Sequence, residues 1–212
     1  MGKQMKTATE YSASTVERTL LDLVAIPSVS SSSNAPVIDY VAGRLAKSPW
    51  QIRRHVYHDE RGVQKINAIV SSSRQSKNVE LALVCHTDTV PFDPAWAHAV
   101  HPVINKGRIY GRGSCDIKGF LACALTALIE TDPGQLNNPL ALILTADEEI
   151  GCIGAKRLAN EKRIRPRFAI VGEPTGLSPV FAGKGYALAE VVVRGKEAHS
   201  AFPAGRSRAC RR

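Results

Sequence analysis

Three short apolar segments of this chain each end in acidic residues or a histidine, and this repeated pattern limits the folds open to the chain. The segments are Leu81–His86, Leu140–Thr145 and Phe168–Val171. Their length and lack of polar alternation are typical of buried strands covered on both faces. Asp88, Asp147–Glu149 and Glu173 follow them. Ligands of open α/β sheets bind beyond the carboxyl ends of the strands, so the three ends predict one shared site.

Helical and strand patterns alternate along the rest of the chain, which predicts an α/β fold. Helices are predicted over residues 14–24, 36–45, 120–129 and 153–160, the first behind a capping box at Ser14–Glu17. Further strands are predicted over 51–57 and 66–71, with a hairpin over 104–110 that turns at Lys106 and Gly107. We interpret the serine-rich segment Ser28–Asn34 as a flexible connection. We therefore expect a mixed, largely parallel sheet flanked by helices.

The polar residues at the strand ends have the chemistry of a metal site. His86 and Asp88 are two positions apart in a predicted strand, so their side chains share a face. A carboxylate beside an imidazole fixes its tautomer, as happens around many metal-binding histidines. The three acids Asp147–Glu149 are costly at the end of a buried strand unless a cation or water meets them, and an exposed acidic turn is the alternative. One histidine with Asp116 and two glutamates predicts a divalent cation site.

The glycines of the segment Gly111–Gly119 invite comparison with nucleotide-binding loops. Asp116, however, occupies the position of the last glycine in the G-x-G-x-x-G pattern. A carboxylate there repels phosphate, so we reject a nucleotide-binding fingerprint. Asp116 instead lies just before the predicted helix 120–129, close to its positive end.

Four motifs in this order resemble those of the di-zinc amidohydrolases and exopeptidases. They are His86–Pro91, Gly111–Gly119, Asp147–Gly154 and Val171–Thr175. That family includes acetylornithine deacetylase, succinyl-diaminopimelate desuccinylase, aminoacylase and carboxypeptidase G. The resemblance extends over roughly residues 14 to 203. The amino-acid sequences of the second and third motifs are most similar to those of the acetylornithine deacetylases. The resemblance implies a zinc-exopeptidase-like catalytic domain followed by an α+β lid or dimerisation domain.

The resemblance also implies roles for individual residues. His86 and Glu173 would bind one zinc, Asp116 would bridge both zinc ions and Glu149 would bind the second; Co²⁺ is a substitute metal. Glu148 would be the general base. Asp88 would orient His86, and His199 would stabilise the oxyanion in the partner subunit's site of a homodimer.

The implied reaction is the zinc-dependent hydrolysis of the amide bond of an N-acyl amino acid. The similarity of the second and third motifs to those of the acetylornithine deacetylases implies conversion of N-acetylornithine to ornithine and acetate, a step of arginine biosynthesis. A succinyl-diaminopimelate desuccinylase or a dipeptidase is one alternative, and a non-catalytic metal-binding fragment is another.

The end of the chain departs from the family pattern. The family uses a late histidine on the second zinc, and no histidine follows His199. We expect a flexible N-terminus over 1–13, an incomplete catalytic domain over 14–180 and the start of the lid domain over 181–203. Residues 204–212 are interpreted as the frameshifted tail of a truncated product, with a genuine basic tail as the alternative.

Charge and cysteine usage restrict the partners and the compartment. The net charge is +9, but four of the 28 basic residues lie in the last seven positions, and the other 24 against 19 acidic residues leave +5. No basic helix with interleaved aromatic residues accompanies this charge, so we expect no nucleic-acid partner. Five scattered cysteines and the absence of a signal or membrane-spanning segment predict a cytoplasmic protein with free thiols and no membrane partner.

Overall fold

A computed structural model of the chain describes residues 15–72, 77–185, 187 and 189–192. The chain divides into two units, Met1–Gly176 and Leu177–Arg212. Every helix and strand of the described residues belongs to the first unit. The described residues of the second unit form no helix or strand. The expected start of a lid domain over 181–203, the flexible N-terminus and the basic tail therefore stay predictions.

The helices and strands lie where the sequence pattern predicts them. The helices are α1 (Thr15–Ala25), α2 (Ala35–Leu45), α3 (Lys118–Glu130) and α4 (Ile153–Asn160), with the 3-10 helix η2 (Pro133–Gln135). The strands are β1 (Gln51–His58), β2 (Gln64–Ser71), β3 (Asn78–His86), β4 (Val103–Asn105), β5 (Arg108–Tyr110), β6 (Leu140–Thr145) and β7 (Arg165–Val171). Ser14, the first residue of the predicted capping box, lies outside the described residues.

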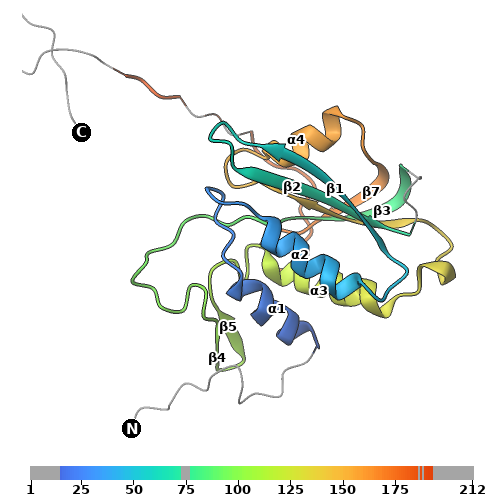
Figure 1. The fold of residues 1–212 in the computed structure, drawn as a ribbon, viewed down its shortest axis with the longest axis horizontal. Coiled ribbons are helices and arrows are strands. Elements are labelled where there is room, and N and C mark those ends of the chain that lie inside the picture. The colour runs from blue at the N-terminus through green and yellow to red at the C-terminus, as the bar shows by residue number, and fades with distance from the viewer. Residues whose placement is uncertain (1–14, 73–76, 186, 188, 193–212) are drawn as a thin grey trace, which may run out of the picture. The chain divides into compact units, whose positions relative to one another are not determined.

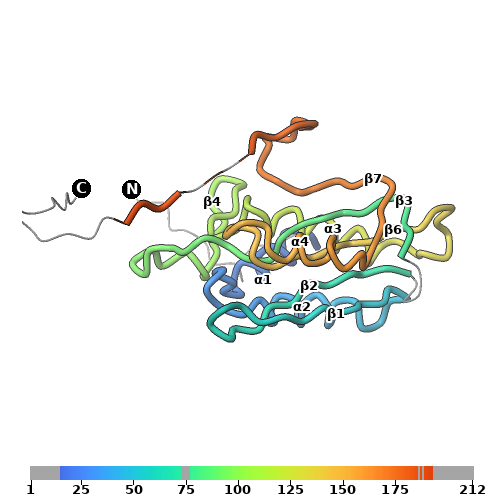
Figure 2. The backbone as a smooth tube through the Cα atoms, turned by 90° about the horizontal axis from the view of Figure 1, so that it is seen from above, coloured from blue at the N-terminus to red at the C-terminus, as the bar shows by residue number. Residues whose placement is uncertain are grey.

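Five strands form one sheet in the order β1-β2-β6-β3-β7, seen side by side in Figure 2. Strand β3 is parallel to both β6 and β7, and β2 is antiparallel to β1 and β6. Four strands therefore run in one direction and β2 runs against them, which confirms the expected mixed, largely parallel sheet. In this register His86 lies opposite Thr145, so the chain leaves β3 and β6 at the same edge of the sheet.

Helices cover both faces of the sheet, with α1, α2 and α3 on one face and α4 on the other (Figure 1). The larger core lies on the three-helix face, where Leu121 and Leu125 of α3 pack with Leu142 and Leu144 of β6. A smaller core on the opposite face includes Leu158 of α4. Strand β6 is therefore covered on both faces, as its apolar sequence predicts.

Strand β7 differs from the sequence-based expectation of a buried strand. All seven of its residues are exposed, including Phe168, Ile170 and Val171. It pairs with β3 on one side and has no strand on the other side among the residues that the structure describes. The apolar pattern correctly predicts a strand, but it does not predict that this strand lies at an edge.

Strands β4 and β5 form a separate hairpin. Its turn is at Lys106 and Gly107, both with positive φ (49° and 73°), as a two-residue turn of this kind requires. The predicted hairpin is confirmed. In the described part of the chain, no helix combines the length and apolar character that crossing a bilayer requires.

Candidate metal centre

His86, the last residue of β3, is held in one orientation by the backbone. Its side chain is almost fully buried, and Nδ1 lies 2.9 Å from the carbonyl oxygen of Asp88. A carbonyl oxygen can only accept a hydrogen bond, so Nδ1 is the donor in this contact, and Nε2 is directed away from Asp88. Nε2 lies 3.1 Å from Oδ1 of Asp116. An imidazole nitrogen and a carboxylate oxygen at this distance need a proton or a metal cation between them.

Asp116 lies in the loop just before α3, as predicted. The backbone N–H of Lys118 donates to the carbonyl oxygen of Gly113 (2.9 Å) and closes this loop. Gly113 has a φ of +79°, and a Cβ there would lie 2.9 Å from Cγ2 of Thr89. The positive φ of this turn and the closeness of Thr89, in the loop that follows β3, therefore both favour glycine at this position. The Asp116 side chain is about half exposed and faces His86.

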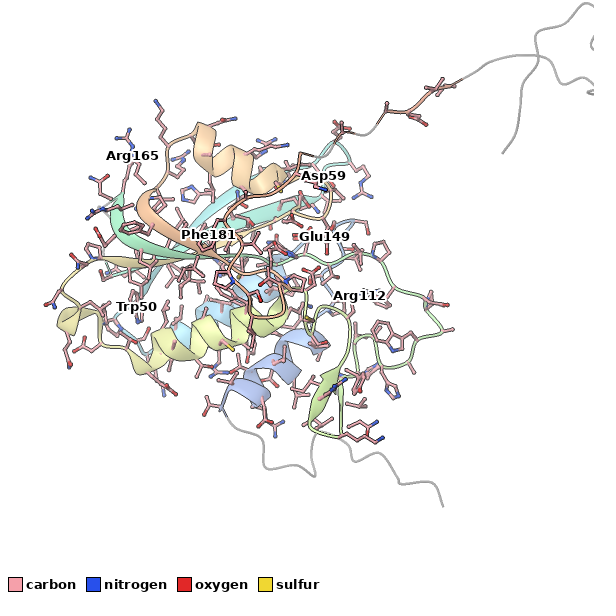
Figure 3. The ribbon with its side chains drawn as sticks, turned by 180° about the vertical axis from the view of Figure 1, so that it is seen from behind. Trp50, Asp59, Arg112, Glu149, Arg165 and Phe181 are labelled. Carbon is pink, nitrogen blue, oxygen red and sulfur yellow. The ribbon has the colours of Figure 1, made fainter. Side chains whose placement is uncertain are left out.

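The third member of the site is Glu149, which follows β6. One nitrogen of His86 and one carboxylate oxygen each from Asp116 and Glu149 lie within 4.8 Å of one another. Burial, and secondly the negative charge of Asp116, raise the pKa of the Glu149 carboxyl. Figure 3 shows Glu149 at the end of the sheet opposite Trp50 and Arg165. One imidazole nitrogen and two carboxylates are ligands that Zn²⁺ accepts, so these residues fit the metal that the family resemblance implies.

The buried carboxylate of Asp88 mainly contacts the acidic turn, which we define as Asp147–Glu149. It accepts hydrogen bonds from the backbone N–H groups of Glu148 (3.1 Å) and Glu149 (3.3 Å) and from the hydroxyl of Ser30 (2.7 Å). Its Oδ1 lies 3.7 Å from Nδ1 of His86, too far for a hydrogen bond. Asp88 thus contacts the His86 imidazole through its backbone carbonyl oxygen and not through its carboxylate. Its role in catalysis stays a prediction.

Glu148, the predicted general base, lies beside the three-residue cluster. Its Oε2 is 4.0 Å from Nε2 of His86, and its side chain is one-third exposed. The thiol of Cys152 donates to its Oε1 at 3.4 Å. The carboxylate is therefore close to the site and still open to solvent, as a group that exchanges protons with water needs to be.

Glu173 and His199 have a different standing from the clustered residues. Glu173 follows the exposed strand β7 and is not part of the cluster of ligand atoms within the described residues. Partial desolvation raises the pKa of its carboxyl, the nearby His86 lowers it, and the charges of Glu148, Asp116 and Glu149 raise it further, so Glu173 interacts electrostatically with the site although its side chain is exposed. Its role as a zinc ligand stays a prediction. His199 lies outside the described residues.

The segment Ser28–Asn34 is not the flexible connection that its composition suggests. Ser28, Ser30 and Asn34 are buried, and Ser30 N–H donates to the carbonyl oxygen of Thr89 (3.0 Å). The Asn34 side chain bonds both the N–H and the carbonyl of Ile66 (2.9 and 2.8 Å). The prediction was wrong because serine content reports turn chemistry and not burial. No local signal marks these serines as supports of a site 58 residues further along the chain.

A cavity of about 620 Å³ lies next to the metal centre. Its lining combines Glu149 and Asp147 with Tyr57, Asp59, Arg61 and Val90. Cavities of roughly 300–1,000 Å³ accommodate small molecules. A second cavity of the same volume is lined by arginines and His55; it shares Tyr57 and Arg157 with the first, but none of the clustered ligands lines it.

Comparisons with known proteins agree with this geometry. Residues 82–203 match the model of peptidase family M20/M25/M40. The acetylornithine deacetylase of Myxococcus xanthus is 50% identical over 186 residues, which cover 87% of this chain and 48% of that protein. The acetylornithine deacetylase of Proteus mirabilis is 37% identical over 189 residues, with 85% and 48% covered. The chain thus spans about half the length of the curated relatives it matches.

Solved structures show the same fold. An M20 family metallo-carboxypeptidase from Sulfolobus solfataricus superimposes with a TM-score of 0.57 at 22% identity, covering 76% of this chain and 37% of that one. Human carnosine dipeptidase 1 gives a TM-score of 0.59 at 16% identity, covering 74% and 37%. At these identities the likeness concerns the fold alone.

Proposed function

Because the chain belongs to peptidase family M20/M25/M40, a family of metal-dependent hydrolases, we propose that its metal centre serves the hydrolysis of N-acetylornithine to ornithine and acetate. The observation that carries the proposal is the convergence of His86, Asp116 and Glu149 within 4.8 Å. These residues come from three separate segments, and their carboxylates repel one another unless a cation joins them. The acetylornithine deacetylases among the relatives support the choice of substrate.

His86 and Glu173 would hold one zinc ion, Glu149 would hold a second, and Asp116 would contribute to both. A complete site would take two zinc ions, with Co²⁺ as a substitute. Bound zinc supplies a Lewis acid that lowers the pKa of a water molecule and polarises the amide carbonyl. The buried Nδ1 contact of His86 fixes the orientation of the ring and leaves Nε2 directed at the site, as a metal ligand requires.

Glu148 would perform the proton transfers. Its carboxylate accepts a proton from the attacking water as the water oxygen bonds to the acetyl carbon. The same proton then passes to the ornithine nitrogen as the carbon–nitrogen bond breaks, so that acetate and a free amine leave. Asp88 keeps Glu148 in place through the backbone hydrogen bond of 3.1 Å. His199 would stabilise the negative charge on the acetyl oxygen, a contact whose loss lowers rates by roughly 10²–10³.

A substrate panel tests this proposal. Purified chain with zinc is offered N-acetylornithine, N-succinyl-diaminopimelate and a dipeptide, and release of the free amine is measured. We expect N-acetylornithine to be hydrolysed fastest, but slowly, since the chain spans about half the length of its acetylornithine deacetylase relatives. A chimera that continues residue 203 with the remaining half of the Myxococcus xanthus relative should raise the rate.

Two variants give the panel its controls. Glu148→Gln should lower turnover by about 10²–10⁴ while zinc stays bound, and Glu130→Gln, at the exposed end of α3, should leave it unchanged. If the succinyl compound or the dipeptide is hydrolysed faster than N-acetylornithine, the proposed substrate is wrong and the faster compound takes its place. Stoichiometric zinc binding without hydrolysis, in the chimera as well, would instead favour a non-catalytic metal-binding role.

We place this reaction in the cytoplasm and on a homodimer of the complete protein. Support for the compartment comes from the free cysteines of the described residues, Cys85, Cys115, Cys123 and Cys152, since a reducing environment preserves such thiols. Burial raises the pKa of the Cys85 thiol, so this cysteine stays unreactive inside the core.

A further inference from the structure

The first residue of the acidic turn, Asp147, forms a buried ion pair with Lys65. Nζ of Lys65, on β2, is 2.8 Å from Oδ1 of Asp147, and each side chain is only 1% exposed. The ammonium group also donates to the carbonyl oxygens of Ser30 (2.6 Å) and Ser32 (3.0 Å), so its three hydrogens all have acceptors. The hydroxyl of Tyr57, on β1, donates to the other carboxylate oxygen of Asp147 at 2.9 Å. Asp147 is therefore held from two strands.

Overall stability is a weak reason for keeping such a pair. Removing both charges from water is costly, and an apolar pair of similar volume often stabilises a fold equally well. Asp147 in addition adopts a left-handed backbone conformation with a φ of +58°, which is uncommon for residues other than glycine. Its neighbours must hold it there, and residues held in this way cluster at functional sites.

The backbone geometry of Asp147 determines where the next two side chains lie. Its carbonyl oxygen accepts from the N–H of Ile153 (3.0 Å) at the start of α4, which fixes the far end of the turn. The N–H groups of Glu148 and Glu149 both point to the carboxylate of Asp88. The acidic turn is thus anchored to Asp88 through the N–H groups of Glu148 and Glu149, and to Lys65 and Tyr57 through the carboxylate of Asp147.

We propose that Lys65 and Tyr57 are positioning residues, which act through Asp147 to hold Glu149 in the metal cluster and Glu148 beside it. This role rests on the proposed metal-dependent function. It assigns different tasks to the three adjacent acids: Glu149 is a ligand, Glu148 is the base, and Asp147 is a fully buried anchor that never meets the metal. The cation that a buried acid needs is in this case a lysine 82 residues away in sequence.

The experiment compares variants of the full 212-residue chain with a matched control. Tyr57→Phe removes only the hydroxyl that bonds Asp147, and Lys65→Met removes the charge but keeps much of the side-chain length. Trp50→Phe is the control, because it also removes a buried hydrogen bond, from Nε1 to the carbonyl of Leu128 (2.7 Å), at the opposite end of the sheet (Figure 3). Zinc affinity is measured by competition with a chelator, and the visible absorption spectrum of the Co²⁺-loaded chain reports ligand geometry.

We expect zinc affinity to fall about tenfold in Tyr57→Phe and up to about a hundredfold in Lys65→Met, as for other residues that orient metal ligands. The Co²⁺ spectrum should change in both variants. Trp50→Phe should lower the unfolding midpoint while leaving zinc affinity within about twofold and the Co²⁺ spectrum unchanged, because a hydrogen bond far from the site affects stability alone. If Lys65→Met fails to fold, Tyr57→Phe decides the question.

Zinc affinity and Co²⁺ spectra that stay at wild-type values in the folded Tyr57→Phe chain would overturn the positioning role and leave the proposed function standing. A wild-type chain that binds neither zinc nor Co²⁺ would overturn both. Wild-type binding with a selective loss in Tyr57→Phe, and none in Trp50→Phe, supports the positioning role.

Discussion

Strands β6 and β7 both contain an apolar segment but have different surroundings. The segments are Leu140–Leu144 and Phe168–Val171, acidic residues follow each of them, and both strands run parallel to β3. Five of the six residues of β6 are buried, whereas all seven residues of β7 are exposed. Strand β6 lies between β2 and β3 with helices on both faces, while β7 has one neighbouring strand among the described residues. An apolar pattern thus shows that a strand can be buried, and the neighbouring elements decide whether it is.

The acids that follow the two strands differ in the same way. Asp147, after β6, is completely buried and paired with Lys65, and Glu149 reaches the metal cluster. Glu173, after β7, is exposed and lies outside that cluster. The residues that follow a central strand have well-defined positions because several neighbouring elements contact the end of that strand. An edge strand has fewer contacts to hold its end in place.

The largest difference should appear when the same side chain is truncated in the two strands. Ile143→Ala in β6, where the side chain is 5% exposed, should lower the free energy of unfolding by about 2–5 kcal/mol through lost burial and a residual cavity. Ile170→Ala in β7, at 51% exposure, should cost less than about 1 kcal/mol. Urea unfolding of both variants measures this, and equal losses would show that β7 is covered in solution.

The stabilisation that zinc gives the folded chain should differ between variants of Glu149 and Glu173. This difference should be smaller than the one between the two isoleucine variants. Zinc at about 100 times its dissociation constant should stabilise the folded chain by about 2.7 kcal/mol. Glu149→Gln should remove most of that gain, and Glu173→Gln should remove less of it, because Glu173 lies outside the cluster before metal binds. Thermal unfolding with and without zinc tests the order, with Glu130→Gln as an exposed control. A larger loss in Glu173→Gln would reverse the ranking of the two strand ends.

Self-association should depend on β7 and not on the other edge of the sheet. Phe168 and Ile170 are 56% and 51% exposed on a strand that has one neighbouring strand among the described residues, and such edge surfaces favour association. Replacing both by lysine should shift the chain towards monomer in sedimentation velocity, with little change in unfolding free energy. Val56→Lys in β1 is the matched control, since Val56 is also half exposed (52%) on an edge strand. A wild-type chain that is already a single monomeric species would contradict this prediction.

The smallest effect concerns β1, the other edge strand, which α4 partly covers. Burial, and secondly the charges of Arg163 and Arg53, lower the pKa of His55 below its ordinary value of 6.5. The unfolded chain therefore binds a proton more readily than the folded chain. The contribution of His55 to stability is complete above about pH 6.5 and is lost as the pH falls through its lowered folded-state pKa.

His55→Gln should flatten the decline in unfolding free energy between about pH 7.5 and pH 5.5. The change should be well under about 1 kcal/mol, because solvent screens a half-buried group. His58→Gln, at the exposed end of the same strand, provides the control. An identical pH dependence in wild type and His55→Gln would show that the β1 edge is as open to solvent as β7.

Most of the fold could be predicted from local sequence patterns. The boundaries of α4 and β6 coincide with the predicted ones, and those of the other elements differ by a few residues, because apolar periodicity and turn residues act over short distances. The strand order, in which β6 lies between β2 and β3, has no such local signal. The start of a second domain stays a prediction, since the residues expected to form it show no helix or strand where they are described.

For the candidate site as well, some features could be predicted from the sequence and others could not. The sequence alone predicted that His86 and Glu149 would lie near each other, because parallel strands bring their carboxyl ends to one edge of a sheet, and it placed Asp116 in the loop before a helix. Only the tertiary structure decided that Lys65 neutralises Asp147, that Ser30 supports Asp88, and that β7 is exposed. Each of these depends on which distant segment lies beside a residue. That choice follows from strand order and helix packing, which hydrophobic periodicity does not encode.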